Sequence, residues 1–566
     1  MVLIVIGGDI CYAQKFDNVW VMGYNYDFDI ASENFKMVFD TFPPRIEIAE
    51  GKLYIDRASA SICDSVGSLK LHTNNCFMVN ANEEFIEGGD TLTEGWELDW
   101  CNTYWWYPFD MSNLLIPNPG KKNEILFFQR TVYNNPPIFY AQKLLYSIID
   151  LNGSNGKGKF IEKHKVVIDN KFSYGEMTAV KHGNGMDWWL PMPVQKGNTI
   201  YLIHVTKDSV YVQGDQSLGP DWSDSGSFQA VFSPDGSRYA RYNPFYGLYL
   251  YDFDRCSGEL SNLRFFSVSK TAQGLAGGVC FSPNGNLLYL SEYDSLFQIS
   301  LNSPDTWGSR RLVAVFDGNI CALWSRFGTI FPGPDGRLYI KPPATSSCIH
   351  VINRPNLRGP ACDVRQHDII FPNPCANPQN FPNFRLGPLD GSPCDTLGFN
   401  NYPLADFRPE ASDSSGLAWE FWDVSSYAPT HWLWDFGDGA MSEDTTAAHV
   451  FAAPGDYTVC LTVSNAYGVN TKCKVMRVMT TGVSGVGAEK DGVRLYPNPT
   501  TGLLRVSGDQ ARAYAVRVYD LNGRLVFSGK TLAGEVDLSG LSNGSYLLQV
   551  ADEDGVVRRG KVVVLR

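Results

Sequence analysis

The sequence predicts an all-β protein that begins with a β-propeller, and three observations support this prediction. The segment Phe-Ser-Pro-Asp-Gly at 232–236 recurs as Phe-Ser-Pro-Asn-Gly at 281–285 and as Phe-Pro-Gly-Pro-Asp-Gly at 331–336, which places the turn prolines 49 and 51 positions apart. Runs of β-branched and aromatic residues separated by polar turns fill the first 400 residues. No long helical pattern interrupts them. A period near 50 residues with several strands per repeat is typical of propeller blades.

Each repeat has the chemistry of a tight turn between two strands. Proline presets the first turn angle, and the glycine that closes the motif tolerates a positive φ. Upstream, the same rhythm of strands is visible in the apolar runs at 51–55, 125–128, 144–150 and 199–203. Residues 15–400 are therefore expected to form a propeller of six or seven blades, of which seven is favoured.

The composition fits many short strands and excludes some partners. Hydrophobic residues make up 44% of the 566 positions and charged residues only 19%, with 53 glycines and 32 prolines. The net charge of −13 repels phosphate backbones and anionic lipid headgroups, so nucleic acid is not expected as a partner. No apolar run reaches the roughly 18 residues of a transmembrane helix.

Residues 1–14 are expected to be a signal peptide. An apolar run at 2–6 is followed by Cys11, Tyr12 and Ala13, a small-x-small cleavage pattern, although no Lys or Arg precedes the run. A buried first strand is the alternative. Without Cys11, twelve cysteines remain, an even number that suits an oxidising compartment.

A new β pattern begins after the Pro-, Asn- and Cys-rich stretch near 360–410, and residues 401–481 resemble a PKD domain, an immunoglobulin-like β-sandwich. The resemblance rests on Trp-Asp-Phe-Gly-Asp-Gly at 434–439, His-Val-Phe at 449–451 and Pro-Gly-Asp-Tyr at 454–457. It implies that Trp434 and Phe436 point into the sandwich. Asp435 and Asp438 are read either as caps of a tight turn, which is favoured, or as a calcium pair. Cys460 and Cys473, on successive strands, are a candidate disulfide.

After a short linker at 482–489, residues 490–566 resemble the type A sorting domain of the Bacteroidetes type IX secretion system. This family has its own small β-sandwich, so the resemblance predicts two Ig-like β-sandwich domains after the propeller. It implies recognition by the outer-membrane translocon, removal of the domain after export, and release or outer-membrane attachment of the body. The motif residues are Tyr496, Pro497, Asn498, Pro499, Gly502, Asp520, Gly523, Gly544 and Tyr546.

The first 400 residues also resemble the propeller-like regions that precede such modules in secreted proteins, on pieces such as 61–69 and 181–189. This resemblance names no activity. A Gly-x-Ser-x-Gly motif at 540–544 is read as a turn, because no helix follows it. No catalytic residue, metal site or cofactor is predicted, since the histidines never pair at ligand spacing.

Two aromatic clusters are the candidate ligand sites. In the first, Trp188 and Trp189 would stack on sugar rings while His182 and Asp187 bind hydroxyl groups. A structural reading of the same cluster is favoured, in which these aromatics fill the gap between neighbouring blades. The pair Trp105 and Trp106 allows the same two readings.

Cys63 and Cys76, thirteen positions apart across a predicted hairpin, are a second candidate disulfide, with a free buried pair as the alternative.

These features predict a secreted, cell-surface binding or adhesion protein, with a glycan or protein ligand on the propeller and the PKD domain as a spacer. The alternative is a secreted propeller hydrolase or lyase acting on a polysaccharide or another extracellular substrate. Acids contributed by separate blades would leave no contiguous motif, so the sequence does not decide between the two.

Overall fold

A computed structural model of the chain divides into two compact units, one made of residues 1–413 and 417–478 and the other of 414–416 and 479–566. The structure describes residues 15–23, 33–55, 58–104, 107, 112–135, 138–173, 175, 177–222, 229–268, 277–319, 321, 325–343, 346–375, 381–412, 415–479, 495–496, 500, 502–506, 515–520, 524–531, 535–542, 544–551 and 557–564. The predicted signal peptide lies outside these residues.

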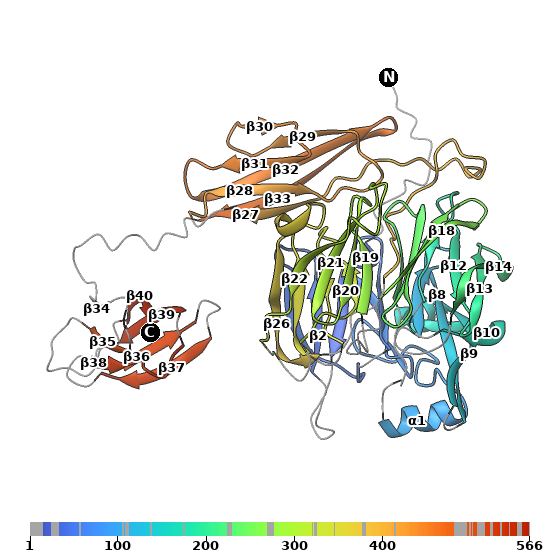
Figure 1. Cartoon of the computed structure of the whole chain (residues 1–566), viewed down its shortest axis with the longest axis horizontal. Helices are drawn as coiled ribbons and strands as arrows, with labels where there is room; N and C mark the ends of the chain where they lie inside the picture. The colour runs from blue at the N-terminus through green and yellow to red at the C-terminus, as the bar shows by residue number, and fades with distance from the viewer. Residues whose placement is uncertain are drawn as a thin grey trace. The chain divides into compact units, whose positions relative to one another are not determined.

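The first unit begins with seven antiparallel sheets in chain order (Figure 1). Two have three strands: β1 (Val19–Gly23), β2 (Glu33–Val38), β3 (Arg45–Glu50); and β4 (Ala60–Cys63), β5 (Leu69–Thr73), β6 (Met78–Asn80). The third and fourth have four strands: β7 (Asn113–Pro117), β8 (Glu124–Asn135), β9 (Ile138–Asp150), β10 (Lys159–Phe172); and β11 (Val180–Lys181), β12 (Trp188–Pro193), β13 (Gly197–Val205), β14 (Val210–Trp222).

The remaining three sheets also have four strands each. They are β15 (Gln229–Phe232), β16 (Arg238–Asn243), β17 (Gly247–Phe253), β18 (Leu260–Ser267); β19 (Gly277–Phe281), β20 (Leu287–Glu292), β21 (Ser295–Ser300), β22 (Arg311–Val315); and β23 (Ile330–Pro332), β24 (Leu338–Ile340), β25 (Ser346–Ile352), β26 (Val364–Cys375). The helices are short: α1 (Trp96–Tyr104), α2 (Gly153–Gly156) and the 3-10 turn η1 (Gly359–Cys362). The all-β propeller prediction is confirmed, with seven sheets.

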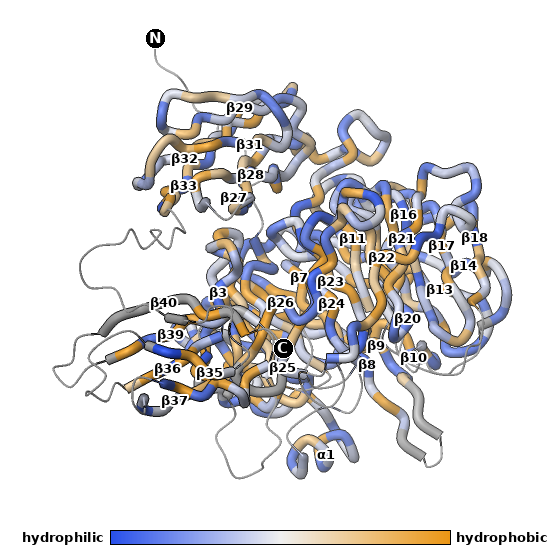
Figure 2. The backbone as a smooth tube through the Cα atoms, turned by 60° about the vertical axis from the view of Figure 1, so that its left-hand side comes forward, coloured by the Kyte–Doolittle hydropathy of each residue, from blue (hydrophilic) through white to orange (hydrophobic). Residues whose placement is uncertain are grey.

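The first strands of the sheets line up around the ring. Strand β1 contacts β4, β4 contacts β7, β15 contacts β19 and β19 contacts β23, while β1 also contacts β26 of the last sheet. Trp20 of β1 packs on Tyr339 of β24, with ring centroids 5.2 Å apart. Hydrophobic residues, orange in Figure 2, run along the strands, whereas the turns are mostly blue. Sheet one thus packs against sheet seven and closes the ring.

The repeated Pro-Asp-Gly motif forms the turn between the first and second strands of sheets five, six and seven. Its glycines, Gly236, Gly285 and Gly336, have φ of +73°, +71° and +76°. A side chain is strained in this left-handed region, so glycine is the residue that fits. In two of the turns the glycine N–H donates to a serine carbonyl three residues earlier, at 2.8 Å.

The strand order gives the propeller two different faces. Because consecutive strands are antiparallel, turns after first and third strands lie at one edge of a sheet, and turns after second strands lie at the other. In sheets four to seven we call the first edge the turn face, which includes 182–187 and the three Pro-Asp-Gly turns. The other edge, where the chain passes between sheets, is the connection face. There Tyr293 pairs with Phe327 and Val194 with Phe172, so connections pack against turns.

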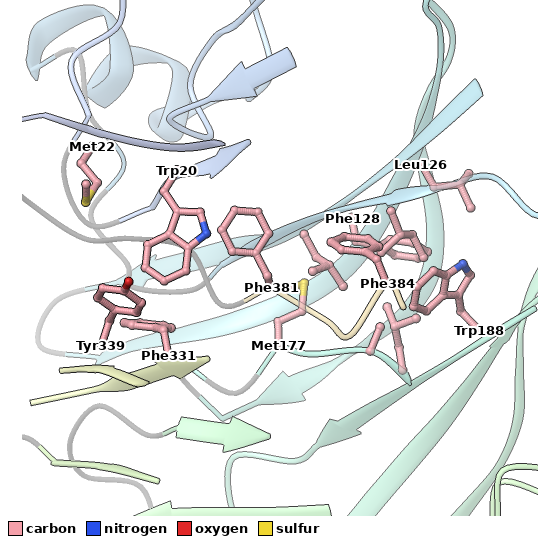
Figure 3. Close-up of a cluster of buried hydrophobic side chains, with 14 of the residues drawn as sticks. Trp20, Met22, Leu126, Phe128, Met177, Trp188, Phe331, Tyr339, Phe381 and Phe384 are labelled. Carbon is pink, nitrogen blue, oxygen red and sulfur yellow. The ribbon is translucent and has the colours of Figure 1, made fainter. Parts of the chain in front are cut away.

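Residues 381–396, here called the closing segment, cross the turn face. They follow sheet seven, yet Phe381 stacks on Trp20 of sheet one with centroids 5.9 Å apart, and Phe384 lies 5.9 Å from Trp188 of sheet four (Figure 3). The amide of Asn383 donates to the Pro234 carbonyl of sheet five at 2.8 Å. A segment that reaches sheets one, four and five within a few residues must pass over the middle of the ring.

Side chains from non-neighbouring sheets share one hydrophobic cluster at this point. The cluster joins residues of sheets one, three, four and seven, with Phe381 and Phe384 between them. The guanidinium of Arg385 holds Asp17, just before β1, through two hydrogen bonds of 2.6 and 2.7 Å. The closing segment therefore fixes the start of the propeller to its end.

A β-sandwich follows within the first unit. One sheet is β27 (Phe407–Ala411), β28 (Ala418–Asp423) and β31 (Thr446–Val450), and the other is β30 (Met441–Ser442), β29 (His431–Asp435), β32 (Gly455–Asn465) and β33 (Gly468–Val478). Trp434 and Phe436 are buried in the core between them, as predicted.

The second unit is a smaller sandwich. Its sheets are β34 (Leu495–Tyr496), β35 (Leu503–Val506), β38 (Glu535–Asp537), and β37 (Leu525–Lys530), β36 (Ala515–Tyr519), β39 (Gly544–Ala551), β40 (Val557–Val564). Val516, Val518, Leu548 and Val562 are among its buried core residues. The alternation of buried and exposed residues along β36 is what a half-buried strand requires.

Four disulfides are present among the described residues: Cys76–Cys101, Cys256–Cys394, Cys321–Cys348 and Cys460–Cys473. The last was predicted. The predicted pairing of Cys63 with Cys76 is wrong, and Cys63 is a buried free thiol. Cys63 ends β4 on one edge of sheet two, whereas Cys76 lies in the turn after β5 on the opposite edge. The β5 strand keeps them apart, and Cys76 instead holds helix α1 against the connection face.

Candidate functional site

The cluster predicted around His182 forms a compact stack of rings at the turn face. His182 follows β11, Trp189 lies on β12, and His204 lies next to the end of β13, where it pairs with Trp189 across neighbouring strands. The His204 imidazole lies over the Trp189 indole at 4.2 Å and 17°, and the two imidazoles stack at 5.2 Å and 21°. His204 was not predicted, because nothing in its surroundings on an alternating strand distinguishes it.

Hydrogen bonds fix the His182 ring as neutral. Its Nδ1 accepts from the Asn184 N–H at 3.0 Å, so its Nε2–H donates to the Cys256 carbonyl at 3.0 Å. Burial lowers the pKa of His182 and of His204. The Asp187 carboxylate accepts from the Asn184 amide at 2.8 Å and lies 3.8 Å from His204 Nε2.

The closing segment covers this cluster. The Leu389 N–H donates to the Gly183 carbonyl at 2.8 Å, and the Cys256–Cys394 disulfide ties the same segment to sheet five. Trp188 and Trp189 are only 1% and 2% exposed, so neither indole presents a face to solvent. This burial favours the reading in which the aromatics fill the space between blades.

The other predicted pair, Trp105 and Trp106, lies outside the described residues. The helix before it, α1, lies on the side of the first unit opposite the sandwich (Figure 1), which is the side of the connection face. It carries Trp96, Trp100 and Tyr104 at four-residue spacing, the spacing of one helix face. The Trp100 and Tyr104 rings are 4.4 Å apart, and Tyr104 is 40% exposed. Sequence reasoning missed this helix because aromatic residues favour strands.

Glu97 anchors α1 from its buried side. One carboxylate oxygen accepts hydrogen bonds of 2.6 Å from the Tyr107 hydroxyl and from the Val132 N–H of β8. Burial raises the pKa of Glu97 to about 7, although these two hydrogen bonds oppose the rise. The helix is thus held by a carboxyl group that titrates near neutrality.

A second polar group on the connection face lies between sheets six and seven. The Arg326 guanidinium pairs with Asp294 and lies over the rings of Tyr293 and Phe316, at 4.8 and 5.5 Å from their centroids. Cation–π contact and ion pairing together hold this arginine at the surface. No motif in the sequence joins these residues, because they come from separate loops.

The first sandwich docks on the turn face through buried charges. Arg408 of β27 is 3% exposed, and its guanidinium lies over Phe42. Glu410 accepts hydrogen bonds from Asn353 at 2.7 Å and Arg365 at 2.8 Å. Charges removed from water in this way require partners with defined geometry, so the contact is specific.

Asp406 forms a further link between the sandwich and the propeller. Its carboxylate contacts the ammonium groups of Lys15 at 2.9 Å and Lys474 at 2.8 Å. Burial alone would raise the pKa of Asp406, but Lys474 and Lys15 outweigh it and hold this pKa well below its usual range.

The two aspartates of the Trp-Asp-Phe-Gly-Asp-Gly motif cap turns. Asp435 accepts from the Gly437 N–H at 2.9 Å and Asp438 from the Ala440 N–H at 3.1 Å. Asp438 also pairs with His449 at 2.7 Å. These contacts are those of the favoured reading.

In the second unit, Asp520 accepts from the Arg524 N–H at 2.9 Å, and the Tyr546 hydroxyl donates to the Ser542 carbonyl at 2.9 Å. Gly502 has a φ of +148°. The motif residues Pro497, Asn498, Pro499 and Gly523 lie outside the described residues, as does the side chain of Tyr496. Ser542, the serine of the Gly-x-Ser-x-Gly motif, lies in the turn between strands β38 and β39.

Two family models match parts of the chain. Residues 400–480 match the PKD domain. Residues 494–565 match the secretion system C-terminal sorting domain. The protein is therefore a secreted cargo of the type IX system that carries a propeller and a PKD domain, and its sorting domain directs it to the translocon and the cell surface. Among the described residues, no helix has the length and apolar character to cross a membrane.

Solved structures show similarities to different extents of the chain. The PKD1 domain of Vibrio anguillarum Epp is 29% identical, with 14% of this chain and 98% of that chain covered and a TM-score of 0.13. An auxiliary nutrient binding protein from Bacteroides thetaiotaomicron is 9% identical over 57% of this chain and 73% of that chain, with a TM-score of 0.30. Apo AztD from Citrobacter koseri is 12% identical over 80% and 98%, with a TM-score of 0.30. The comparison with curated proteins finds no match.

Proposed function

We propose that this protein is a binding or adhesion protein whose ligand site lies on the connection face of the propeller. The observation that carries the proposal is the difference between the two faces. The closing segment and the PKD domain lie on the turn face, and there the predicted His182 cluster is packed beneath the closing segment. The connection face carries helix α1 instead.

The chemistry of the connection face supports a glycan or a protein ligand. Trp100 and Tyr104 offer aromatic rings, and the Arg326–Asp294 pair offers hydrogen-bonding groups in another part of the same face. Aromatic and arginine side chains are the residues that most often dominate binding energies. The charge of −13 disfavours polyanionic ligands.

The test is binding of the labelled full-length protein to arrays of glycans and of surface proteins. We expect binding that falls at least tenfold in Tyr104→Ala. The matched control is Tyr211→Ala, because both tyrosines are 40% exposed and Tyr211 is the second residue of β14, the strand that follows a turn-face turn. Absence of binding on both arrays would refute the proposal, and an equal loss in the two variants would refute the location.

A further inference from the structure

The Cys321–Cys348 disulfide differs from the other disulfides in its surroundings, and the inference drawn from it does not depend on the proposed binding function. Cys321 lies in the connection between sheets six and seven, and Cys348 lies on β25. The His367 Nδ1 atom is 2.8 Å from Cys321 Sγ and 3.2 Å from Cys348 Sγ. The two sulfurs and an imidazole nitrogen all lie within 4.8 Å of one another.

The backbone places His367 here through a bulge. The register of β25 and β26 shifts between Ile349 and Val351, and His367, on the bulged strand, has a φ of +56°. This left-handed conformation costs free energy in a residue other than glycine. Bulges commonly change the direction in which a side chain points. The His367 N–H donates to His350 Nδ1 at 3.1 Å, and the second nitrogen of that ring binds the Ser325 carbonyl at 2.7 Å.

A carboxylate fixes which nitrogen of His367 faces the sulfurs. The Nε2 atom lies 3.1 Å from Asp317 Oδ1, so Nε2–H donates to the carboxylate and the lone pair of Nδ1 points at the disulfide. Metal-binding histidines have this arrangement, with the remote ring N–H held by a carboxylate.

All three propeller disulfides have a hydroxyl group beside a sulfur, and for this one it is Ser346, 3.5 Å from Cys348 Sγ, so the His367 imidazole is what distinguishes it. Thr93 lies next to Cys101, and Ser392 next to Cys394. Cys321 is partly exposed, whereas Cys348 is buried, so a reagent in solution would reach this pair through Cys321. These three ligand atoms come from residues 27 and 19 positions apart, which explains why no spacing in the sequence predicted them.

We propose that Cys321, Cys348 and His367 form a redox-gated site for a thiophilic divalent cation such as Zn²⁺. A dithiol reductant supplies two electrons and two protons, its own two sulfurs form a disulfide, and the Cys321–Cys348 bond breaks to give two thiols. The cation then displaces the two thiol protons and is held by two thiolates and Nδ1 of His367. A fourth position stays open to water. In the oxidised protein the sulfurs are bonded to each other and no cation binds.

The required movement is small. With Zn–S near 2.3 Å and Zn–N near 2.0 Å in a tetrahedral site, the sulfurs would lie about 3.7 Å apart and each about 3.5 Å from Nδ1. The present sulfur-to-nitrogen distances of 2.8 and 3.2 Å are therefore within about 1 Å of those values. Once the disulfide is broken, rotation of the two cysteine side chains can bring the sulfur-to-sulfur and sulfur-to-nitrogen distances to these values.

The experiment titrates Co²⁺, a spectroscopic probe for such sites, into the full-length protein before and after anaerobic treatment with dithiothreitol. We expect a thiolate-to-cobalt charge-transfer band at one Co²⁺ per chain in the reduced protein, and no band in the oxidised protein. His367→Ala should abolish the band, and Asp317→Asn should weaken cobalt binding about 10- to 100-fold through loss of the ligand's carboxylate partner.

Two controls make the outcome decisive. Cys460→Ser combined with Cys473→Ser removes a disulfide outside the propeller and should leave the band unchanged. His367→Ala retains the Cys321–Cys348 bond, so equal melting temperatures of the oxidised proteins show that its fold is intact. A reduced wild-type protein without the band, an undiminished band in His367→Ala, or a disulfide that mass spectrometry shows unreduced by dithiothreitol would each overturn the proposal.

Discussion

The buried carboxyl group of Glu97 makes the stability of the first unit depend on pH in a defined direction. Its pKa is about 7 in the folded protein, against an ordinary value of 4.5 for a glutamate side chain. A raised pKa in an acid means that the folded state binds the proton more tightly than the unfolded state does. Stability therefore falls as the pH rises from about 4.5 to 7, and levels off above that.

The size of the effect follows from the shift. A difference of about 2.5 pKa units corresponds to roughly 3 kcal/mol at 1.36 kcal/mol per unit. In Glu97→Gln the side-chain carbonyl can still accept from the Tyr107 hydroxyl and the Val132 N–H, but no charge has to be buried. We therefore expect this variant to exceed the wild type in unfolding free energy by about 3 kcal/mol at pH 8, and to equal it near pH 4.5.

The measurement is urea denaturation of both proteins at steps from pH 4.5 to 8, followed by tryptophan fluorescence. Asp99→Asn, an exposed position on the same helix, is the control, and its stability should stay within about 0.5 kcal/mol of the wild type. A difference between Glu97→Gln and wild type that does not change with pH would refute the reasoning.

Three further predictions concern the closing segment, a disulfide and export. Phe384→Ala should destabilise the first unit by about 3–5 kcal/mol in urea denaturation, because a fully buried ring is removed from the shared cluster; a loss below 1 kcal/mol would contradict this role. Replacing both Cys76 and Cys101 by serine should cost about 3 kcal/mol from a loop of 25 residues, whereas peptide mapping that found Cys63 bonded to Cys76 would restore the original pairing. Deleting residues 490–566 should leave the protein in the periplasm, and its detection on intact cells would contradict the sorting role.

The sequence was sufficient where local chemistry determines local structure. The Pro-Asp-Gly turns were predictable because only certain residues accept their backbone angles, and the PKD sandwich because Trp434 and Phe436 occupy fixed positions in a motif. The propeller followed from the spacing of these turns.

The remaining features depend on contacts between distant segments. The path of the closing segment rests on Phe381, Phe384 and Arg385, which meet residues more than 150 positions away, and its Pro- and Asn-rich composition carries no periodicity. The choice of Cys101 as the partner of Cys76 depended on a helix with no strong helical pattern. Local pattern cannot encode such pairings.

The docked PKD domain has a consequence for how the first unit is organised. The chain leaves the first unit through β33, in the domain that lies on the turn face and is held there by Arg408, Glu410 and Asp406. The PKD domain therefore occupies the turn face, whereas helix α1 stays uncovered by it on the opposite side of the first unit (Figure 1). The charged contacts hold the PKD domain in one orientation relative to the propeller, so the two domains form a single body.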